Sequence, residues 1–351
     1  MQQQIRFCTS SDGTRLAYAI NGVGTPLIRA PHWITHLEHD TAVWGHLLEA
    51  LSQRFKLVRF DQRGCGLSDR NVEDVSFEAW VRDLEAVADA SRLDRFAIFG
   101  VSQGAAIAVA YAARHPDRVT HLVLYGGYAQ GWEHQKQPSS SRDRLYTLGK
   151  LIELGWSGQD ASLRQVFTMQ LIPGANVGQV RALNELMHLS TSAETALRIY
   201  QAFNTLDVRD EARQVRCPTL VMHATGDLRV PFEDGRLLAS LIPDAQFLPL
   251  ESENHLLLAG EPALVKFFEA IDQFIPPAGT GSVLTGLTKR ELDVLEYVAQ
   301  GLNNAQIAAR LNLAEKTVRN YLVVILDKLH MESRTQAVVQ ARQAGFGRNT
   351  G

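Results

Sequence analysis

The sequence FAIFGVSQGA of residues 96–105 decides the fold of the larger part of this chain. Its first four residues form an apolar run, and Ser102 then lies between Gly100 and Gly104. The following residues, 105–114, have the composition of a helix. A strand, a sharp glycine-flanked turn and a helix hold a serine oxygen exposed above a sheet, and the glycines provide the steric room for this turn. The segment therefore predicts a nucleophile elbow at Ser102.

Short runs of β-branched or aromatic residues alternate with amphipathic stretches over residues 5–275, on both sides of this elbow. The predicted strands are Pro26–Ala30, Lys56–Phe60, Phe96–Gly100, His121–Tyr125, Pro218–His223 and Ala245–Leu250. Strands that alternate with helices form a mostly parallel sheet covered on both faces. We therefore expect an α/β domain over residues 1–275.

Two polar residues that follow later strands can complete a catalytic site with the serine. A nucleophilic serine needs a base to take its proton and a carboxylate to orient that base. Asp227 and His255 each follow a predicted strand, in the chain order serine, acid, histidine. Ser102, Asp227 and His255 are the predicted catalytic residues. Together with the elbow, they give residues 5–275 a specific resemblance to the α/β-hydrolase fold.

This resemblance implies a helical cap over the active site. Residues 130–212 interrupt the alternation of strands and helices with helical stretches that carry aromatic residues and methionines. In α/β-hydrolases an insertion at this place covers the catalytic serine. Most of its large side chains would pack the cap, and a minority would line an apolar pocket above Ser102. The expected ligand is small and largely hydrophobic, such as an ester or a lactone, and no cofactor is expected.

The resemblance also implies an oxyanion hole made of two backbone N–H groups. One comes from Gln103, the residue after the nucleophile, and the other from Trp33. The family usually has His-Gly after the first parallel strand, whereas this chain has Pro31-His32-Trp33. Proline and histidine have narrower backbone freedom than glycine, and loss of one oxyanion donor lowers rates by about 10²- to 10³-fold. Hydrolysis therefore stays open, and His32 and Trp33 are expected to line the ligand pocket.

Two further polar segments each have a structural and a functional interpretation. Residues 61–69 (DQRGCGLSD) resemble a loop of the hydrolase family, either a turn braced by Arg63 or a ligand contact; the structural role is favoured. The second segment contains His32, His36, Glu38, His39 and Asp40. It is either a loop at the pocket mouth or a metal site, and we expect no metal.

Signals for a small helical domain follow a stretch rich in proline, glycine, serine and threonine. Residues 276–284 have no apolar periodicity and are the predicted linker. Thr288 can cap a helix, with Glu291 returning the hydrogen bond to the cap, and Gly301 stands where a helix-ending glycine belongs. Asn303 and Gln306 repeat the capping pattern. We expect four helices over residues 285–346, the fourth around 334–344.

The third of these helices has the layout of a DNA-recognition helix. Its apolar residues follow helical spacing and are Val318, Leu322, Ile325, Leu326 and Leu329. This spacing leaves exposed Lys316, Thr317, Arg319, Asn320 and Val323. A helix fits the major groove, where arginine bonds guanine, asparagine bonds adenine and an aliphatic group contacts the thymine methyl.

Five runs in this region together resemble a LuxR-type helix-turn-helix: residues 287–291, 301–308, 315–320, 325–329 and 334–337. The resemblance implies that Arg319, Asn320 and Val323 face bases, that Lys316 and Thr317 hold phosphates, and that the fourth helix pairs two protomers on a two-fold site in duplex DNA. A plain helical bundle with a solvated charged face is the structural alternative. Ala314 stands where the family often has a capping serine, and a missing cap costs roughly 1 kcal/mol.

Composition agrees with a two-domain protein of the cytoplasm. The 351 residues exceed what one core usually holds, and the net charge of −3 hides an excess of eight Lys/Arg over six Asp/Glu, or +2, in residues 285–345. No apolar run approaches the roughly 18 residues that span a bilayer, and the N-terminus lacks the layout of a secretory signal. The chain has three cysteines, which lie far apart at Cys8, Cys65 and Cys217. This odd number and wide spacing argue against a disulfide framework.

Three functions fit these features. The first is a transcription regulator whose hydrolase-like domain senses a small molecule and so shifts DNA binding. The second is a serine hydrolase of the esterase or lactonase type, tethered to DNA or oligomerised by its helix-turn-helix. The third combines them in a sensor that slowly hydrolyses its signal. A complete DNA-reading module favours the first function.

Overall fold

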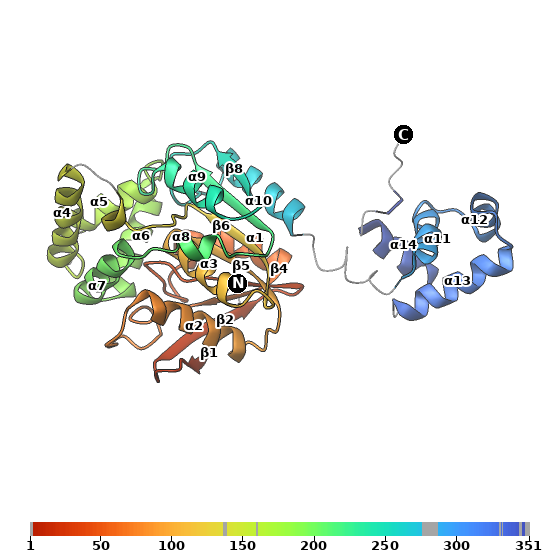
Figure 1. Cartoon of the computed structure of the whole chain (residues 1–351), viewed down its shortest axis with the longest axis horizontal. Coiled ribbons are helices and arrows are strands. Elements are labelled where there is room, and N and C mark those ends of the chain that lie inside the picture. Colours follow the sequence, from red (N-terminus) through yellow and green to blue (C-terminus); the bar gives the residue numbers. More distant parts are fainter. Residues whose placement is uncertain are drawn as a thin grey trace. The chain divides into compact units, whose positions relative to one another are not determined.

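The computed structural model describes residues 3–135, 139–158, 161–275, 287–329, 331, 333–343 and 346–347. The chain divides into two compact units, Met1–Phe274 and Ile275–Gly351 (Figure 1). The predicted linker, 276–284, lies outside the described residues. None of the described helices combines the length and the apolar character that crossing a membrane requires.

An eight-stranded sheet forms the centre of the first unit, in the order β1-β2-β4-β3-β5-β6-β7-β8. Its strands are β1 (Gln4–Thr9), β2 (Arg15–Asn21), β3 (Thr25–Arg29), β4 (Phe55–Phe60), β5 (Phe96–Val101), β6 (Val119–Tyr125), β7 (Thr219–Ala224) and β8 (Gln246–Leu250). From β4 through β8 all pairs are parallel, whereas β1–β2 and β2–β4 are antiparallel. The mostly parallel sheet is confirmed. The set of predicted strands omitted β1 and β2, and β1 is an edge strand with no fully buried side chain.

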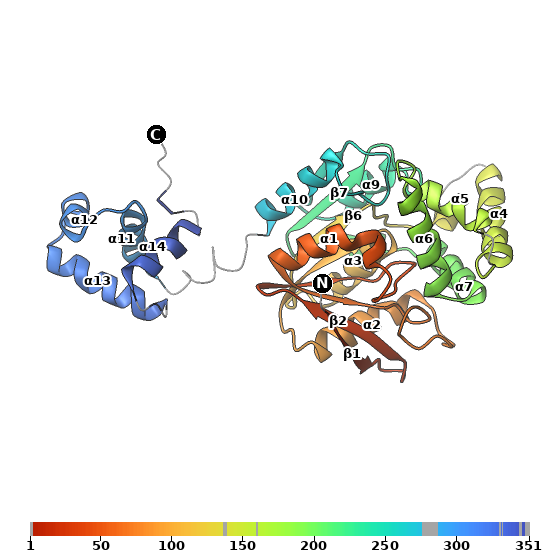
Figure 2. The same cartoon turned by 180° about the vertical axis from the view of Figure 1, so that it is seen from behind.

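Helices cover both faces of this sheet, as Figures 1 and 2 show from opposite sides. One layer is a chain of contacting helices: α2 (Phe77–Ala90), α3 (Gln103–Arg114), α8 (Arg209–Ala212) and α9 (Phe232–Leu241). On the other face, α1 (Thr41–Arg54) and α10 (Pro262–Phe274) are joined by an ion pair of 2.7 Å between Arg54 and Asp272. Burial on both faces explains why β5 and β7 consist of buried residues throughout.

The insertion between β6 and β7 is helical. It contains η1 (Trp132–His134), α4 (Ser139–Gly155), α5 (Ser162–Leu171), α6 (Val177–Ser190) and α7 (Ala193–Asn204). Asn176 and Gln179 form a capping box at the start of α6. The core of the insertion is aromatic, because Trp156 and Phe167 are buried and their rings contact each other at 6.2 Å.

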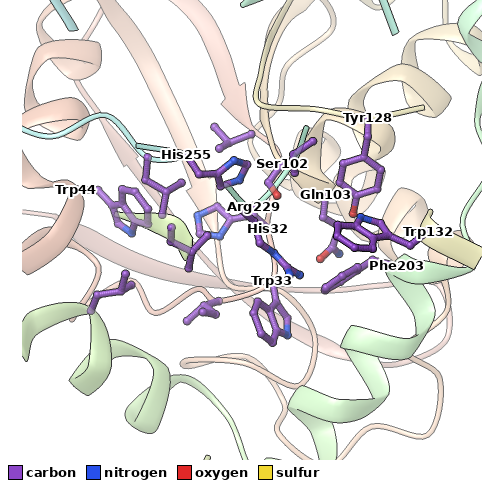
Figure 3. A pocket seen from close by; sticks show the side chains of 16 residues that line it. His32, Trp33, Trp44, Ser102, Gln103, Tyr128, Trp132, Phe203, Arg229 and His255 are labelled. Atoms are coloured by element: carbon purple, nitrogen blue, oxygen red, sulfur yellow. The ribbon is translucent and has the colours of Figure 1, made fainter. Parts of the chain in front are cut away.

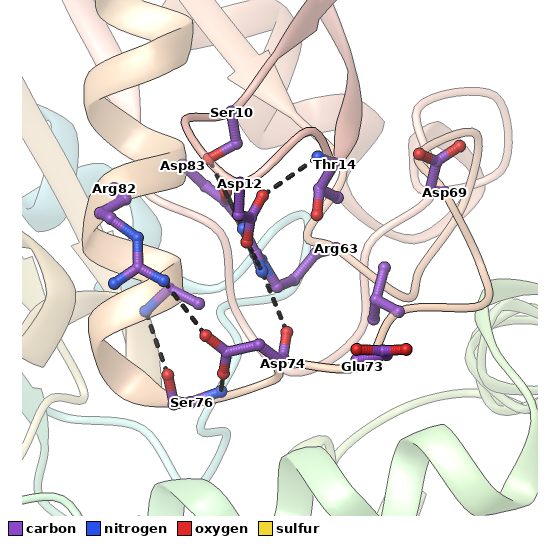
Figure 4. A network of polar contacts seen from close by, with 12 residues as sticks. Ser10, Asp12, Thr14, Arg63, Asp69, Glu73, Asp74, Ser76, Arg82 and Asp83 are labelled. Atoms are coloured by element: carbon purple, nitrogen blue, oxygen red, sulfur yellow. Dashed lines mark hydrogen bonds and ion pairs between the residues drawn. The ribbon is translucent and has the colours of Figure 1, made fainter.

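Arg63 braces the loop after β4, as the structural interpretation of residues 61–69 expects (Figure 4). Its guanidinium is fully buried and donates to both carboxylate oxygens of Asp83, at 2.6 and 2.7 Å. It also donates to Asp12 at 2.6 Å and to the Asp74 carbonyl at 3.0 Å. Such bidentate, charge-assisted bonds join the loop to α2 and to the β1–β2 turn. The side chain is thereby committed to structure.

The second unit contains four helices among its described residues: α11 (Lys289–Ala299), α12 (Asn304–Leu311), α13 (Glu315–Lys328) and α14 (Arg334–Gln343). Both predicted capping boxes are present, and Gly301 has a positive φ of 86°. Ala314 begins α13 without a side-chain cap. Ala337 and Ala341 of α14 are buried in the core of this unit, so these two side chains are not available to a second protomer.

Candidate functional site

Ser102 occupies the sharp turn between β5 and α3 that the sequence predicts. Its φ of 53° and ψ of −124° lie in a region that residues with a side chain rarely adopt. A Cβ atom at Gly100 would lie 2.7 Å from the Ala105 Cα, and one at Gly104 would lie 2.7 Å from the Pro31 carbonyl oxygen. Both glycines are therefore required by close backbone approach, and they let α3 begin directly behind the serine.

Asp227 and His255 are brought together at the ends of β7 and β8. His255 Nδ1 lies 2.6 Å from Asp227 Oδ2, and both side chains are fully buried. The other carboxylate oxygen accepts the backbone N–H groups of Arg229 and Val230, at 2.8 and 2.9 Å. Burial by itself raises the pKa of Asp227, but the neighbouring His255 and His223 outweigh it and hold the pKa below its usual value. The carboxylate is thus ionised and aimed at His255.

A second histidine, His223 of β7, also contacts this carboxylate. Its Nε2 lies 3.5 Å from Asp227 Oδ2 and 3.0 Å from the Val230 carbonyl oxygen. Because both neighbours are acceptors, Nε2 carries the proton and donates to Val230. Sequence reasoning missed this residue. Its position four residues before Asp227, at the end of the same strand, is the signal that could have found it.

Ser102 and His255 line one pocket, but the hydrogen bond that would complete a triad is not formed. His255 Nε2 is buried and has no hydrogen-bond partner among the described residues. Ser102 is half-buried and lies beside it in Figure 3. Catalytic hydrogen bonds are often long before substrate binds, and a serine oxygen moves by rotation about one bond. The structure therefore places in one region the residues predicted as nucleophile, base and orienting carboxylate, and their catalytic roles stay a prediction.

The pocket is lined mainly by apolar and aromatic side chains (Figure 3). It holds about 600 Å³ of space, its opening to solvent included. The full set of lining residues is His32, Trp33, Ile34, Trp44, Val101, Ser102, Gln103, Tyr128, Trp132, Leu171, Leu183, Phe203, Arg229, Val230, His255 and Leu256. His32 and Trp33, the residues predicted to line it, are both present. Trp33 also contacts the cap, because its Nε1 donates to the Ala196 carbonyl of α7 at 3.3 Å.

Two backbone N–H groups at this pocket are free to bind an oxyanion. Within the described ranges, neither the N–H of Trp33 nor that of Gln103 has a hydrogen-bond acceptor. The N–H of Ser102, by contrast, donates to the Tyr125 carbonyl at 3.0 Å. The Gln103 side chain is held away from the serine by a 3.0 Å bond to Gln62. The role of the Trp33 and Gln103 N–H groups as oxyanion donors stays a prediction.

His32 is a neutral imidazole that binds a buried cation. Its Nε2 contacts the Arg29 guanidinium, which can only donate, so Nε2 is the acceptor and Nδ1 carries the proton. Burial, and then the charge of Arg29, hold the pKa of His32 well below its usual value. The ring packs edge-on against Trp44, with centroids 5.6 Å apart. His32 is therefore a hydrogen-bond donor at the pocket wall rather than a base.

The segment considered as a possible metal site is partly brought together. His36, Glu38 and His39 each offer a ligand atom, and these atoms lie within 4.8 Å of one another. The backbone N–H of Glu38 donates to His36 Nδ1 at 3.3 Å, which leaves Nε2 of that ring. His32 and Asp40 are engaged elsewhere, with Arg29 and Arg59. The expectation that this segment holds no metal stays a prediction.

The residues expected to contact DNA form one face of α13. Lys316, Arg319, Asn320 and Val323 are exposed, and Thr317 is half-buried. The opposite face packs into the core through Val318, Leu322 and Ile325. Arg319 lies 3.6 Å from Glu315, an exposed pair that is weak enough for a competing base or phosphate to replace.

Comparisons with known proteins agree with both units. The α/β hydrolase fold family matches residues 37–262, and the family described as bacterial regulatory proteins, luxR family, matches residues 285–341. A protein of Azorhizobium caulinodans named "Putative carbamate hydrolase RutD" is 27% identical over 267 residues, which cover 74% of this chain and 96% of that protein. A pyrrolizixenacetamide deacetylase of Xenorhabdus hominickii is 26% identical over a match that covers 69% of this chain and 88% of that protein.

A solved esterase from Exiguobacterium antarcticum shares the fold, with a TM-score of 0.65 at 21% identity. It covers 76% of this chain, and 98% of that structure is matched. The chain therefore belongs to the α/β hydrolase fold family and carries, over residues 285–341, a DNA-binding helix-turn-helix domain of the luxR family of bacterial regulatory proteins.

Proposed function

We propose that this protein is a transcription regulator of the cytoplasm, in which a small molecule bound by the hydrolase-fold unit changes the affinity for duplex DNA. In this proposal residues 1–275 are the sensor, with a cap over 130–212, residues 276–284 are the linker and residues 285–346 bind DNA. One observation carries it: a luxR-family helix-turn-helix stands in the same chain as a lined pocket around Ser102. A DNA-reading module has no role in hydrolysis itself, so its presence favours regulation.

The exposed face of α13 supports DNA reading in the major groove. Arg319 and Asn320 lie three and four residues after Lys316, and Val323 lies four and three residues after them, so the four residues share one side of the helix. Arginine can bond a guanine edge, asparagine an adenine edge and valine a thymine methyl, while Lys316 and Thr317 hold phosphates. A homodimer on a two-fold site is part of the proposal. Its contact through α14 would use side chains other than the buried Ala337 and Ala341.

A second candidate function is ester or lactone hydrolysis, and the 2.6 Å pair of Asp227 and His255 favours it. Ser102 Oγ would bond to the carbonyl carbon while its proton passes to His255 Nε2 and on to the leaving oxygen. The N–H groups of Trp33 and Gln103 would stabilise the oxyanion. Water would then release the acid and restore the serine. The relatives named as a deacetylase and an esterase support acyl transfer as the reaction class.

DNA recognition is tested with two single variants, each of which removes one arginine, the first in the helix-turn-helix unit and the second in the hydrolase-fold unit. Duplexes are first selected from a random library by the full chain, and their affinity is then measured by mobility shift. Arg319→Ala is expected to weaken binding about 5- to 150-fold, since a bidentate arginine–guanine contact is worth about 1–3 kcal/mol. Arg236→Ala removes an equally exposed charge from α9 and is expected to leave affinity unchanged. Equal affinities of the two variants would show that α13 does not read DNA.

Sensing is tested by filling the pocket covalently. A fluorophosphonate that labels Ser102 occupies the site, and DNA affinity is compared before and after labelling. Coupling between two sites is typically worth 1–3 kcal/mol, so an affinity change of about 5- to 150-fold is expected. Ser102→Ala, treated in the same way, controls for reaction elsewhere. Unchanged affinity of fully labelled protein would contradict sensing through this pocket.

A further inference from the structure

We propose that Arg229 is an anion anchor in this pocket, and that the ligand is a small ester, lactone or amide carrying a carboxylate. This inference rests on the proposed function and names the ligand class of the same site. Arg229 lies two residues after Asp227, in the loop between β7 and α9, and its side chain lines the pocket with Ser102 and His255 (Figure 3). Only 9% of Arg229 is exposed, so its charge is removed from bulk water.

Arg229 differs from the other buried arginines of the described chain in having no strong acceptor. Arg29 and Arg59 share Asp40, Arg63 pairs with Asp83 and Asp12, and Arg164 donates to the carbonyls of Gly155, Trp156 and Gly158. Arg229 reaches only neutral groups, the side-chain oxygen of Gln170 at 3.5 Å and the hydroxyl of Tyr200, and forms no ion pair within the described ranges. An uncompensated buried charge costs several kcal/mol, so a group that supplies the missing negative charge would bind strongly.

The nearest acid along the chain cannot serve this arginine, because Asp227 is already saturated. Its Oδ1 accepts two backbone N–H groups, and its Oδ2 faces His255 and His223 at 2.6 and 3.5 Å. One of those two N–H groups belongs to Arg229 itself. The Asp227 carboxylate therefore fixes the backbone of Arg229 beside the predicted catalytic residues.

An aromatic wall holds the guanidinium in place without neutralising it. Its central carbon lies 5.7 Å from the ring centroid of Trp33, 5.9 Å from that of Tyr200 and 5.7 Å from that of Phe203. Cation–π contacts stabilise the charge, but ring faces do not satisfy the in-plane N–H donors. The donor edge of Arg229 is thus oriented and meets only neutral acceptors, the Gln170 oxygen and the Tyr200 hydroxyl, which a planar anion can replace.

The rest of the pocket agrees with an anionic ligand. None of the sixteen lining side chains is an aspartate or glutamate. On another part of the wall, His32 offers an N–H polarised by the Arg29 behind it. A carboxylate matches the planar fork of an arginine with two parallel hydrogen bonds. The ligand would place its carbonyl at Ser102, its carboxylate on Arg229 and an apolar body against Leu171 and Leu183.

This proposal is tested by binding, so that neither turnover nor DNA coupling enters the result. The full chain carrying Ser102→Ala is titrated calorimetrically with monomethyl glutarate and with methyl valerate, which has a similar length and no charge. We expect the anionic ester to bind at least about tenfold more tightly. Adding Arg229→Gln should abolish that preference and leave the affinity for methyl valerate within about threefold, whereas Arg229→Lys should restore part of it.

Arg236→Gln provides the matched control, because it removes an exposed charge from α9, outside the pocket. The preference should be unchanged in this variant, and circular dichroism confirms that each variant is folded. Equal binding of both esters, binding of neither ester, or a preference that survives Arg229→Gln would each overturn the anchor. Failure of Ser102 labelling to change DNA affinity would instead contradict sensing and leave the anchor intact.

Discussion

The substitution Asp227→Asn tests how the acid orients the base. Asparagine has nearly the same shape, and its oxygen can keep the two backbone bonds that Asp227 Oδ1 accepts from Arg229 and Val230. Its NH₂ group then replaces Oδ2, 2.6 Å from His255 Nδ1. The loop geometry is therefore retained while one acceptor becomes a donor.

The expected loss of reactivity follows from the position of one proton. An amide N–H donates, so His255 must present a lone pair at Nδ1 and carry its proton on Nε2, the atom that has to accept the proton of Ser102. A wrong tautomer of this kind lowers the rate by about 10⁴ in serine proteases with the same constellation. We expect a loss of about 10³- to 10⁴-fold here, or about 4–5.5 kcal/mol of activation free energy.

The assay is the rate at which a fluorophosphonate labels Ser102, followed by intact mass, together with hydrolysis of 4-nitrophenyl butyrate. Ser102→Ala gives the background rate. Asp210→Asn makes the same chemical change at a site whose side chain is 89% exposed, and its rate should stay within about threefold of the parent. If Asp227→Asn labels within tenfold of the parent at an unchanged melting temperature, the carboxylate does not set the tautomer.

Three further expectations concern stability. Thr288→Ala removes the cap of α11 and should lower helix stability by about 1 kcal/mol. Ala314→Ser should stabilise α13 by up to the same amount, because the residue at this position has cap dihedrals but no side-chain bond. Hydrogen exchange of the amides in 289–299 and 315–328 measures both effects, and unaltered exchange would contradict them. Arg63→Met leaves Asp83 buried without its partner and should lower the free energy of unfolding by about 3–5 kcal/mol in calorimetry or urea unfolding, so a cost under about 1 kcal/mol would refute the bracing role. Burial raises the pKa of Asp61 from 3.8 to about 7 in the folded chain, so the folded state holds its proton more tightly and stability falls as pH rises from about 4 to 7. Asp61→Asn should remove this fall in the free energy of unfolding, which urea unfolding at several pH values measures. The same pH dependence in both proteins would contradict the prediction.

The elbow, the alternation of strands and helices and the helix-turn-helix could be predicted because each depends on neighbours along the chain. The turn at Ser102 requires glycines two residues away on either side, and the caps at Thr288 and Asn303 require a partner three residues later. Apolar spacing likewise told which face of α13 would be buried. These signals are short in sequence, so they survive without knowledge of the fold.

The sequence could not show which polar groups would share a partner. His223 was missed as a second contact of Asp227, because alternation in a buried strand does not reveal what lies at its end. The strand β1 was missed for a related reason, since it is an edge strand with no fully buried side chain. The strand β2 was also missed, although most of its residues are buried. The absent bond between Ser102 and His255 is likewise a property of side-chain placement.

For the elbow and for α13, the amino-acid sequence by itself determined the kind of structure and which side chains are exposed. Only the tertiary structure decided which buried charged groups of the hydrolase-fold unit have a partner of opposite charge. Arg29, Arg59 and Asp40 meet from separate segments of the chain, and Arg229 lacks an acid because Asp227 is already engaged. Local geometry needs only nearby residues, whereas the charge balance of a buried site is set by whichever distant groups the fold brings within a few ångströms.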